Sequence, residues 1–413
     1  MSYRKYFLFV TKLAVIIAVP LFLFCLLVFK RGDTEFFEFL ATDVTPFIAW
    51  PIRFITNLLP FSLTELLAWL LPLVLAYKLI YWLIYTIIRF AASWLALFHL
   101  FNRSYIRKWQ EHNLNYCRYT GRLLLVILFL FSYAFSSYLL FHGYNFERET
   151  LADKLHYDTQ HWQKKDLKQA SEIVVEKLNK LCHLESAVDA GKASLDRSGS
   201  RKIIMEDKKI IFPDSDEKLF NLAVNAYRLA ARKYEFLAGQ TLKVKAVSMS
   251  HYWSYTLTNG MYMPLLLEAN VNVAQAAPFT LFSAAHELAH QRFFAHEDEA
   301  NFLAFLTLSS SDDERAVYAA YLNAWIYLAN DLYKADKTVF LQLYRQLPPQ
   351  AKKDVKAAND YYQRYSRRPI SQKSQNLNDT FIRANGDARG IVSYDEVSKL
   401  LIAYFNEQLK ERK

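Results

Sequence analysis

The sequence predicts a mainly helical α+β protein, with three N-terminal membrane-crossing helices followed by a folded domain that contains a small β-sheet. Long apolar runs are concentrated before residue 150. The section 241–272 alternates and is rich in aromatic and β-branched residues, whereas most of the remainder has apolar residues at helical spacing. A chain of 413 residues is long enough for two structural units, which we place at 1–150 and 151–413.

Three apolar runs come close to the roughly 20 residues that a helix needs to cross a bilayer. They are Leu13–Phe29, Leu63–Ile88 and Leu123–Phe141. The first has a longer apolar core than a signal peptide and no small-residue cleavage site after it, so we expect it to be retained. The aromatic, proline-broken section 36–60 is expected to lie at the membrane interface rather than to cross.

Lys and Arg in the short loops predict the orientation of these helices, because such residues stay in the cytoplasm. They precede or enter the first run and recur between the second and third runs: Arg4, Lys5, Lys12, Arg89, Arg103, Arg107, Lys108, Arg118 and Arg122. We therefore expect a cytoplasmic N-terminus and an extracytoplasmic domain after the third run.

The net charge of +10 does not indicate nucleic-acid binding. Residues 151–413 carry 36 basic and 32 acidic residues, and we find no block of basic residues interleaved with aromatics that would follow a phosphate backbone. The three cysteines form no CxxC pair, and Cys182 has no base paired with it in the sequence, which argues against a structural zinc or a thiol nucleophile. We expect the lipid bilayer as a partner and no nucleic acid.

The later domain is expected to be helical at both ends. Apolar periodicity predicts helices over 151–190 and 215–237, with a polar loop at 189–202 between them. The section 241–272, broken at Thr258–Gly260, predicts a hairpin or short sheet. Helices should follow Pro278, except in the polar segment 367–380, and Ser393 with Glu396 forms a capping box for the last helix.

The segment "HELAH" carries the chemistry. On a helix, His286 and His290 lie one turn apart on one face and can hold one metal ion. Glu287 beside them can take a proton from water activated by zinc, which creates a hydroxide nucleophile. The pattern therefore predicts a zinc-dependent hydrolase, with Glu287 as the catalytic base.

Two residues compete to be the third ligand. The spacing to His296 matches the metzincins, but that group needs a glycine where this chain has Phe293, and a later methionine turn, whereas no methionine follows Met263. A bulky residue is poorly suited to positive φ, so this possibility is not favoured.

The other candidates lie in "EDEAN", residues 297–301. If a helix begins near His296, Glu297 can bind the metal while Asn301, one turn later, braces a ligand. Glu299 remains an alternative to Glu297.

This arrangement resembles the glutamate-ligand zinc peptidases, particularly the HtpX-type membrane peptidases and the prenyl-protein endopeptidases, whose motif continues as E-x-E-A-D. A resemblance over most of the chain rests on "TNGMYMPLLLEANVN", "HELAHQR", "EDEANFLAFL" and "NDTFIRANG…GIVSYDEV". On these segments the chain is similar to a bacterial membrane-anchored family of unknown function. The resemblance implies a multi-pass protein of the bacterial cell membrane with a zincin-like domain, Glu297 as ligand, and Asn301 where the peptidases have aspartate.

Further residues are candidates for handling substrate. Gly260, Met261 and Tyr262 could form an edge strand that pairs with an extended peptide, or an ordinary core strand. Tyr394 is the favoured oxyanion donor, with Tyr361 and His251 as alternatives.

The predicted function is a membrane-anchored zinc endopeptidase acting on a peptide or protein substrate. The alternative from another class is a catalytically inactive zinc-binding membrane receptor or scaffold.

Overall fold

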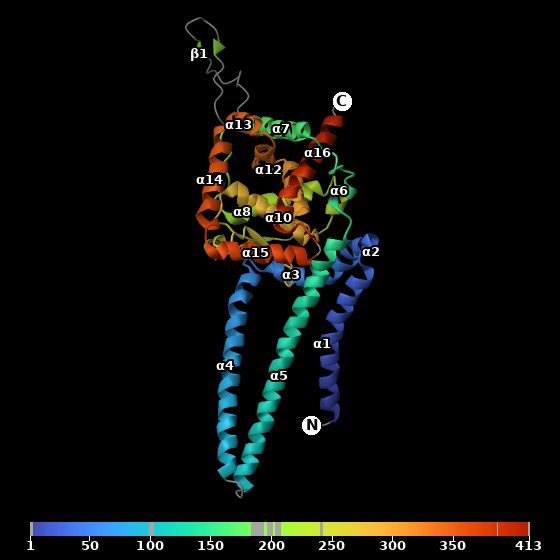
Figure 1. The fold of residues 1–413 in the computed structure, drawn as a ribbon, viewed down its shortest axis with the longest axis vertical. Helices are drawn as coiled ribbons and strands as arrows, with labels where there is room; N and C mark the ends of the chain where they lie inside the picture. The colour runs from blue at the N-terminus through green and yellow to red at the C-terminus, as the bar shows by residue number, and fades with distance from the viewer. Residues whose placement is uncertain are drawn as a thin grey trace. The chain divides into compact units, whose positions relative to one another are not determined.

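The computed structural model describes residues 3–98, 103–182, 194–195, 201–202, 208–239, 243–385 and 387–411. It is mainly helical with a small mixed sheet, which confirms the predicted fold class (Figure 1). The chain forms two compact units. The first joins residues 1–32 with 63–141, and the second joins residues 33–62 with 142–413.

The first unit consists of three long helices, α1 (Tyr3–Lys30), α4 (Leu63–Phe98) and α5 (Arg103–Phe141). Within the described residues, three helical segments are long and apolar enough to cross a membrane: Phe7–Lys30, Leu63–Ala91 and Asn113–Glu147. The prediction of three such helices is confirmed.

The second unit begins with the segment between α1 and α4. This segment forms α2 (Thr34–Phe39), the π-helical turn η1 (Leu40–Val44) and α3 (Thr45–Leu58). It is held to the rest of the unit by ion pairs and hydrogen bonds. Glu38 pairs with Arg148 at 2.7 Å between Oε1 and Nη2, and the buried Lys245 Nζ donates to Thr56 O at 2.7 Å.

The sheet places an edge strand beside the helices of the second unit. Its strands are β3 (Val244–Ala246), β4 (Gly260–Met263) and β5 (Glu268–Val271), in the order β3-β5-β4. β5 is parallel to β3 and antiparallel to β4, and the short α9 (Ser250–Ser254) separates β3 from β4. The predicted short sheet is confirmed, and β4 is one of its edges.

The helical body surrounds α10 (Ala277–Gln291) and α11 (Glu297–Ser309). α10 packs against α8 (Asp216–Ala230), α11, α12 (Glu314–Ala335) and the sheet, and Tyr227 Oη of α8 donates to Ala285 O of α10 at 2.8 Å. Trp325, Phe302 and Phe305 are fully buried around these helices. The remaining helices of the unit after residue 142 are η2 (Gly143–Glu147), α6 (Leu151–Lys154), α7 (Lys164–Cys182), η3 (Glu235–Leu237), α13 (Lys337–Gln346), α14 (Pro349–Ser366), α15 (Pro369–Ala384), η4 (Gly390–Glu396) and α16 (Val397–Glu411).

Three local predictions were wrong. The polar segment 367–380 is not a break, because α15 starts at Pro369, a residue that suits the first helical position since no hydrogen bond needs its missing N–H. The capping box fails because η4 runs directly into α16, and the buried Ser393 Oγ has no hydrogen-bond partner among the described residues. The polar section 189–202 contains the short paired strands β1 (Ser194–Leu195) and β2 (Arg201–Lys202).

Candidate metal centre

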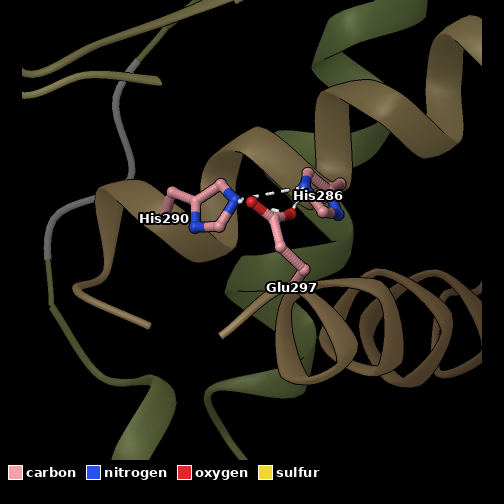
Figure 2. A group of neighbouring side chains, drawn as sticks. All are labelled: His286, His290 and Glu297. Atoms are coloured by element: carbon pink, nitrogen blue, oxygen red, sulfur yellow. Dashed lines mark hydrogen bonds and ion pairs between the residues drawn. The ribbon is translucent and has the colours of Figure 1, made fainter. Parts of the chain in front are cut away.

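Two consecutive helices bring the candidate ligands together. α10 begins near Pro278, as expected, and carries His286 and His290 one turn apart in its last two turns. The chain then reverses and α11 starts directly at Glu297, with His296 as its N-cap residue. Figure 2 shows the carboxylate of Glu297 pointing toward both imidazole rings.

The distances fit one divalent ion. His286 Nε2 lies 3.1 Å from His290 Nε2, and Glu297 Oε2 lies 3.2 Å from the first nitrogen and 3.6 Å from the second. Bond lengths of 2.0–2.2 Å in a tetrahedral zinc site separate neighbouring ligand atoms by about 3.3–3.6 Å. The three groups could therefore hold a metal ion without rearrangement.

Neighbouring acceptors orient both imidazoles. His290 Nδ1 lies 2.7 Å from Phe294 O, and because a carbonyl only accepts, Nδ1 carries the proton. His286 Nδ1 lies 2.8 Å from Asn301 Oδ1, and Asn301 is the residue predicted to brace a ligand. With both protons on Nδ1, each Nε2 turns a lone pair toward the centre, and two lone pairs at this distance repel unless a proton or a metal ion lies between them.

The electrostatics of the three groups favour a positive charge at this point. Burial lowers the pKa of His290, but the charge and hydrogen bond of Glu297 outweigh burial and raise that pKa to about 9. Burial alone would raise the pKa of Glu297, but His290 and His286 hold it well below its ordinary range. A divalent cation satisfies the same charge requirement as a bound proton.

Glu287 lies beside this group and does not belong to it. Burial raises the pKa of Glu287, and the negative charge of Glu297 adds to the rise, while His286 and His290 lower it. The backbone N–H of Tyr262 donates a hydrogen bond to this carboxylate, whereas its buried Oε2 has no hydrogen-bond partner in the described structure. A carboxylate with a raised pKa and a free oxygen suits a group that accepts and returns a proton.

β4 lies directly against Glu287. A Cβ atom added to Gly260 would come within 2.4 Å of Glu287 Oε1, so only glycine fits there without displacing the carboxylate. Tyr262 stacks on the ring of His290 at 6.4 Å between centroids. The structure thus brings Gly260, Met261 and Tyr262 into an edge strand next to the predicted base.

The competing ligands face other partners. Glu299 Oε1 accepts a hydrogen bond from Leu151 N at 2.6 Å, which anchors the start of α6. His296 Nε2 lies 3.3 Å from Phe146 O, and its Nδ1 lies 3.7 Å from Asp387 Oδ2. The geometry therefore joins Glu297, rather than Glu299 or His296, to the two histidines.

Two of the three proposed oxyanion donors have partners outside this group. Tyr361 Oη donates to Ser254 Oγ at 2.7 Å and accepts from Asn272 Nδ2 at 3.2 Å, so both directions of its hydroxyl are used. His251 packs among the rings of Tyr255 and Tyr365. Tyr394 belongs to η4, but its side chain lies outside the described part of the structure.

His142 was not predicted from the sequence as a residue of this site. It is the first residue after α5, and its ring lies 6.0 Å from that of His290 and 6.0 Å from that of Phe381, on which it stacks. The available signal was a single histidine immediately after an apolar run. Nothing in the local pattern connects that position with "HELAH", 144 residues later in the sequence.

The turn between α10 and α11 contradicts one expectation. Phe293 has φ +66°, although a bulky residue is poorly suited to positive φ and was not expected to adopt it here. Several contacts hold it there. Arg148 Nη1 donates to Phe293 O at 2.7 Å, and the Arg53 guanidinium lies 4.7 Å above the buried Phe293 ring. Arg53 Nη2 also donates to Gln291 O at 2.5 Å.

A protein-family comparison matches residues 41–402 to the family described as "Protein of unknown function (DUF3810)". The chain belongs to this family. The match covers the segment that contains α3, the helices α4 and α5, and the complete candidate metal centre. Comparisons with curated proteins and with solved structures found no match.

We predict that His286→Ala and Glu297→Ala each abolish stoichiometric zinc binding, because each removes one of three converging ligands. Glu299→Gln should retain zinc, since its carboxylate bonds to Leu151 N. Elemental analysis of the purified, detergent-solubilised full chain measures the zinc content. Zinc loss in Glu299→Gln with retention in Glu297→Ala would contradict the ligand assignment.

Phe293 offers a test of the strained turn. Both Phe293→Ala and Phe293→Gly lose the buried ring, but only glycine adopts positive φ without strain. The glycine variant should therefore be the more stable by about 1 kcal/mol, the reverse of the order inside a helix. Thermal unfolding of the two variants, followed by circular dichroism, compares them, and equal or inverted midpoints would show that the turn is unstrained.

Proposed function

We propose that this protein is a membrane-anchored, zinc-dependent endopeptidase. The observation that carries the proposal is the placement of Glu287 between a group of three metal-binding side chains and the edge strand β4. A metal group alone also fits a receptor or scaffold. A buried carboxylate with an unpartnered oxygen, aligned beside an edge strand, supports hydrolysis of an extended polypeptide.

A zinc ion held by His286, His290 and Glu297 would polarise the scissile carbonyl and lower the pKa of water. The residues of the chain supply the rest of the chemistry. Glu287 takes one proton from the attacking water as the oxygen bonds to the carbonyl carbon. It then gives that proton to the leaving amine as the C–N bond breaks, so the carboxylate is regenerated. The raised pKa of Glu287 helps the first step, because a very weak base would bind the proton of the water poorly.

The edge strand supplies alignment. β4 pairs with β5 on one side only, and Gly260 removes the side chain that would collide with Glu287. An extended substrate segment that adds to β4 would lie with its backbone beside the carboxylate. We assign substrate alignment to Gly260, Met261 and Tyr262, and keep Tyr394 as the proposed oxyanion donor.

The three long apolar helices serve as the anchor in this proposal. The distribution of Lys and Arg favours a cytoplasmic N-terminus, an extracytoplasmic second unit and a location in the bacterial cell membrane.

Glu287→Gln tests the function. The variant should keep stoichiometric zinc, because Glu287 is not a ligand, and should lose peptide cleavage by a factor of about 10²–10⁴. The assay follows cleavage of an unstructured fluorogenic polypeptide by the full chain in detergent. A wild-type protein that binds zinc but cleaves no more than the variant would instead support the inactive receptor or scaffold.

Gly260→Ala tests the role of the edge strand. The added methyl group must displace the Glu287 carboxylate, so cleavage should fall by about 10²-fold while zinc content is unchanged. Met261→Ala, on the same strand, is the matched control and should have a smaller effect. Wild-type turnover in Gly260→Ala would show that the position of Glu287 does not depend on β4.

A further inference from the structure

α3 is an amphipathic helix whose polar face is buried and whose apolar face is exposed. The face that packs against the rest of the second unit carries small or polar residues, and Thr45, Ala49, Arg53 and Thr56 are all buried there. The opposite face is exposed and apolar, with Phe47 83%, Trp50 58%, Phe54 53% and Leu58 66% exposed. A helix that hides its polar side and presents aromatic residues outward suits an environment less polar than water.

α3 is close in the sequence to two candidate membrane spans. α3 lies between two candidate spans, after Lys30 at the end of α1 and before Leu63 at the start of α4. Only Leu59 to Ser62 separate α3 from α4. Four extended residues cover at most about 14 Å, so the end of α3 cannot move far from the end of a span.

A second helix of the same unit has similar features. α15 exposes Ile370 53%, Leu377 64% and Phe381 44%, at positions that share one helical face. Exposed basic residues lie at the junction of α14 and α15, and they suit anionic headgroups: Arg364, Arg367, Arg368 and Lys373. Figure 1 shows α15 and α3 at the same end of the second unit, opposite α7 and α13.

The candidate metal centre adjoins these helices. The exposed Phe381 of α15 stacks on His142, and the His142 ring lies 6.0 Å from that of His290. His142 directly follows α5 and lies within the third candidate span, Asn113–Glu147. From α3, Arg53 Nη2 bonds to Gln291 O, one residue after His290. Two contact paths therefore connect the apolar surface with the ligands.

We propose that α3 and α15 lie in the interface of a bilayer containing anionic lipid, and that the site acts on polypeptide segments next to that bilayer. The substrate class is then the juxtamembrane part of a membrane-inserted or lipid-attached protein. The bilayer contact stands on the exposed apolar faces and the chain connections. The substrate class additionally rests on the proposed peptidase function.

Spin labels test the bilayer contact in the full chain, reconstituted in nanodiscs with phosphatidylglycerol. A nitroxide replaces Trp50 or Leu377 in a background in which Cys25, Cys117 and Cys182 are alanine and zinc content is retained. Leu341 on α13, which is 41% exposed, is the matched control. The labels at 50 and 377 should collide several-fold more often with oxygen than with a water-soluble nickel chelate, and the label at 341 should show the reverse.

Nickel access at 50 and 377 equal to that at 341 would overturn the bilayer contact. Protection of both labels from oxygen and from nickel would also overturn it, because the face would then be covered by protein.

Paired substrates test the substrate class in proteoliposomes. One cleavable segment directly follows a lipid anchor, and in the other a proline-rich spacer of about 12 residues moves it roughly 37 Å outward. Because both are confined to the membrane, distance from the bilayer is the only difference. The proximal segment should be cleaved about tenfold faster, and Phe54→Glu combined with Leu377→Glu should remove this preference without lowering cleavage of a soluble peptide.

Equal cleavage of the two segments would overturn the substrate class and leave the peptidase proposal intact. Absence of all cleavage, with zinc bound, would overturn the peptidase proposal together with the substrate class, and the spin labels would still decide the bilayer contact.

Discussion

The structure depends on the convergence of two imidazole nitrogens and one carboxylate oxygen on a single point. Asn301 and the carbonyl of Phe294 fix the protons of His286 and His290 on the outer nitrogens, so the inner lone pairs meet. Lone pairs and a carboxylate that face one another are unfavourable without a positive charge between them. The buried arrangement therefore favours a cation, and it constrains the positions of α10, α11 and the turn that joins them.

That turn is supported by residues far away in the sequence. Arg53 and Arg148 bond to backbone carbonyls at its start and at Phe293, and Arg53 also covers the Phe293 ring. Arg53 lies between two candidate membrane spans, and Arg148 follows the third. The strain of a phenylalanine at positive φ is of order 1–3 kcal/mol, and the buried ring and these contacts offset it. The candidate metal centre and the segments that border the candidate spans thus form one packed structure within the second unit.

Much of the helical framework was predictable from sequence. Periodicity and Pro278 located α10, and the expected start near His296 located α11, because helix signals are local. Two of the failures have local explanations. The polar segment 367–380 was separated from the helices although Pro369 starts α15, and the serine of the supposed capping box is buried in η4. His142 and the supported φ of Phe293 depend on partners more than 90 residues away, and local patterns contain no information about them.

The sequence by itself determined the three apolar helices, the helical pair that bears the motif, and the placement of His286, Glu287 and His290 within one turn of α10. Those features depend on residue type and on spacing within one or two turns. Only the tertiary structure decided between Glu297 and Glu299, since both lie in the first turn of α11 and their carboxylates point to different partners. The position of β4 against Glu287 and the outward apolar face of α3 were decided in the same way, because packing between distant segments determines which side of an element faces the protein.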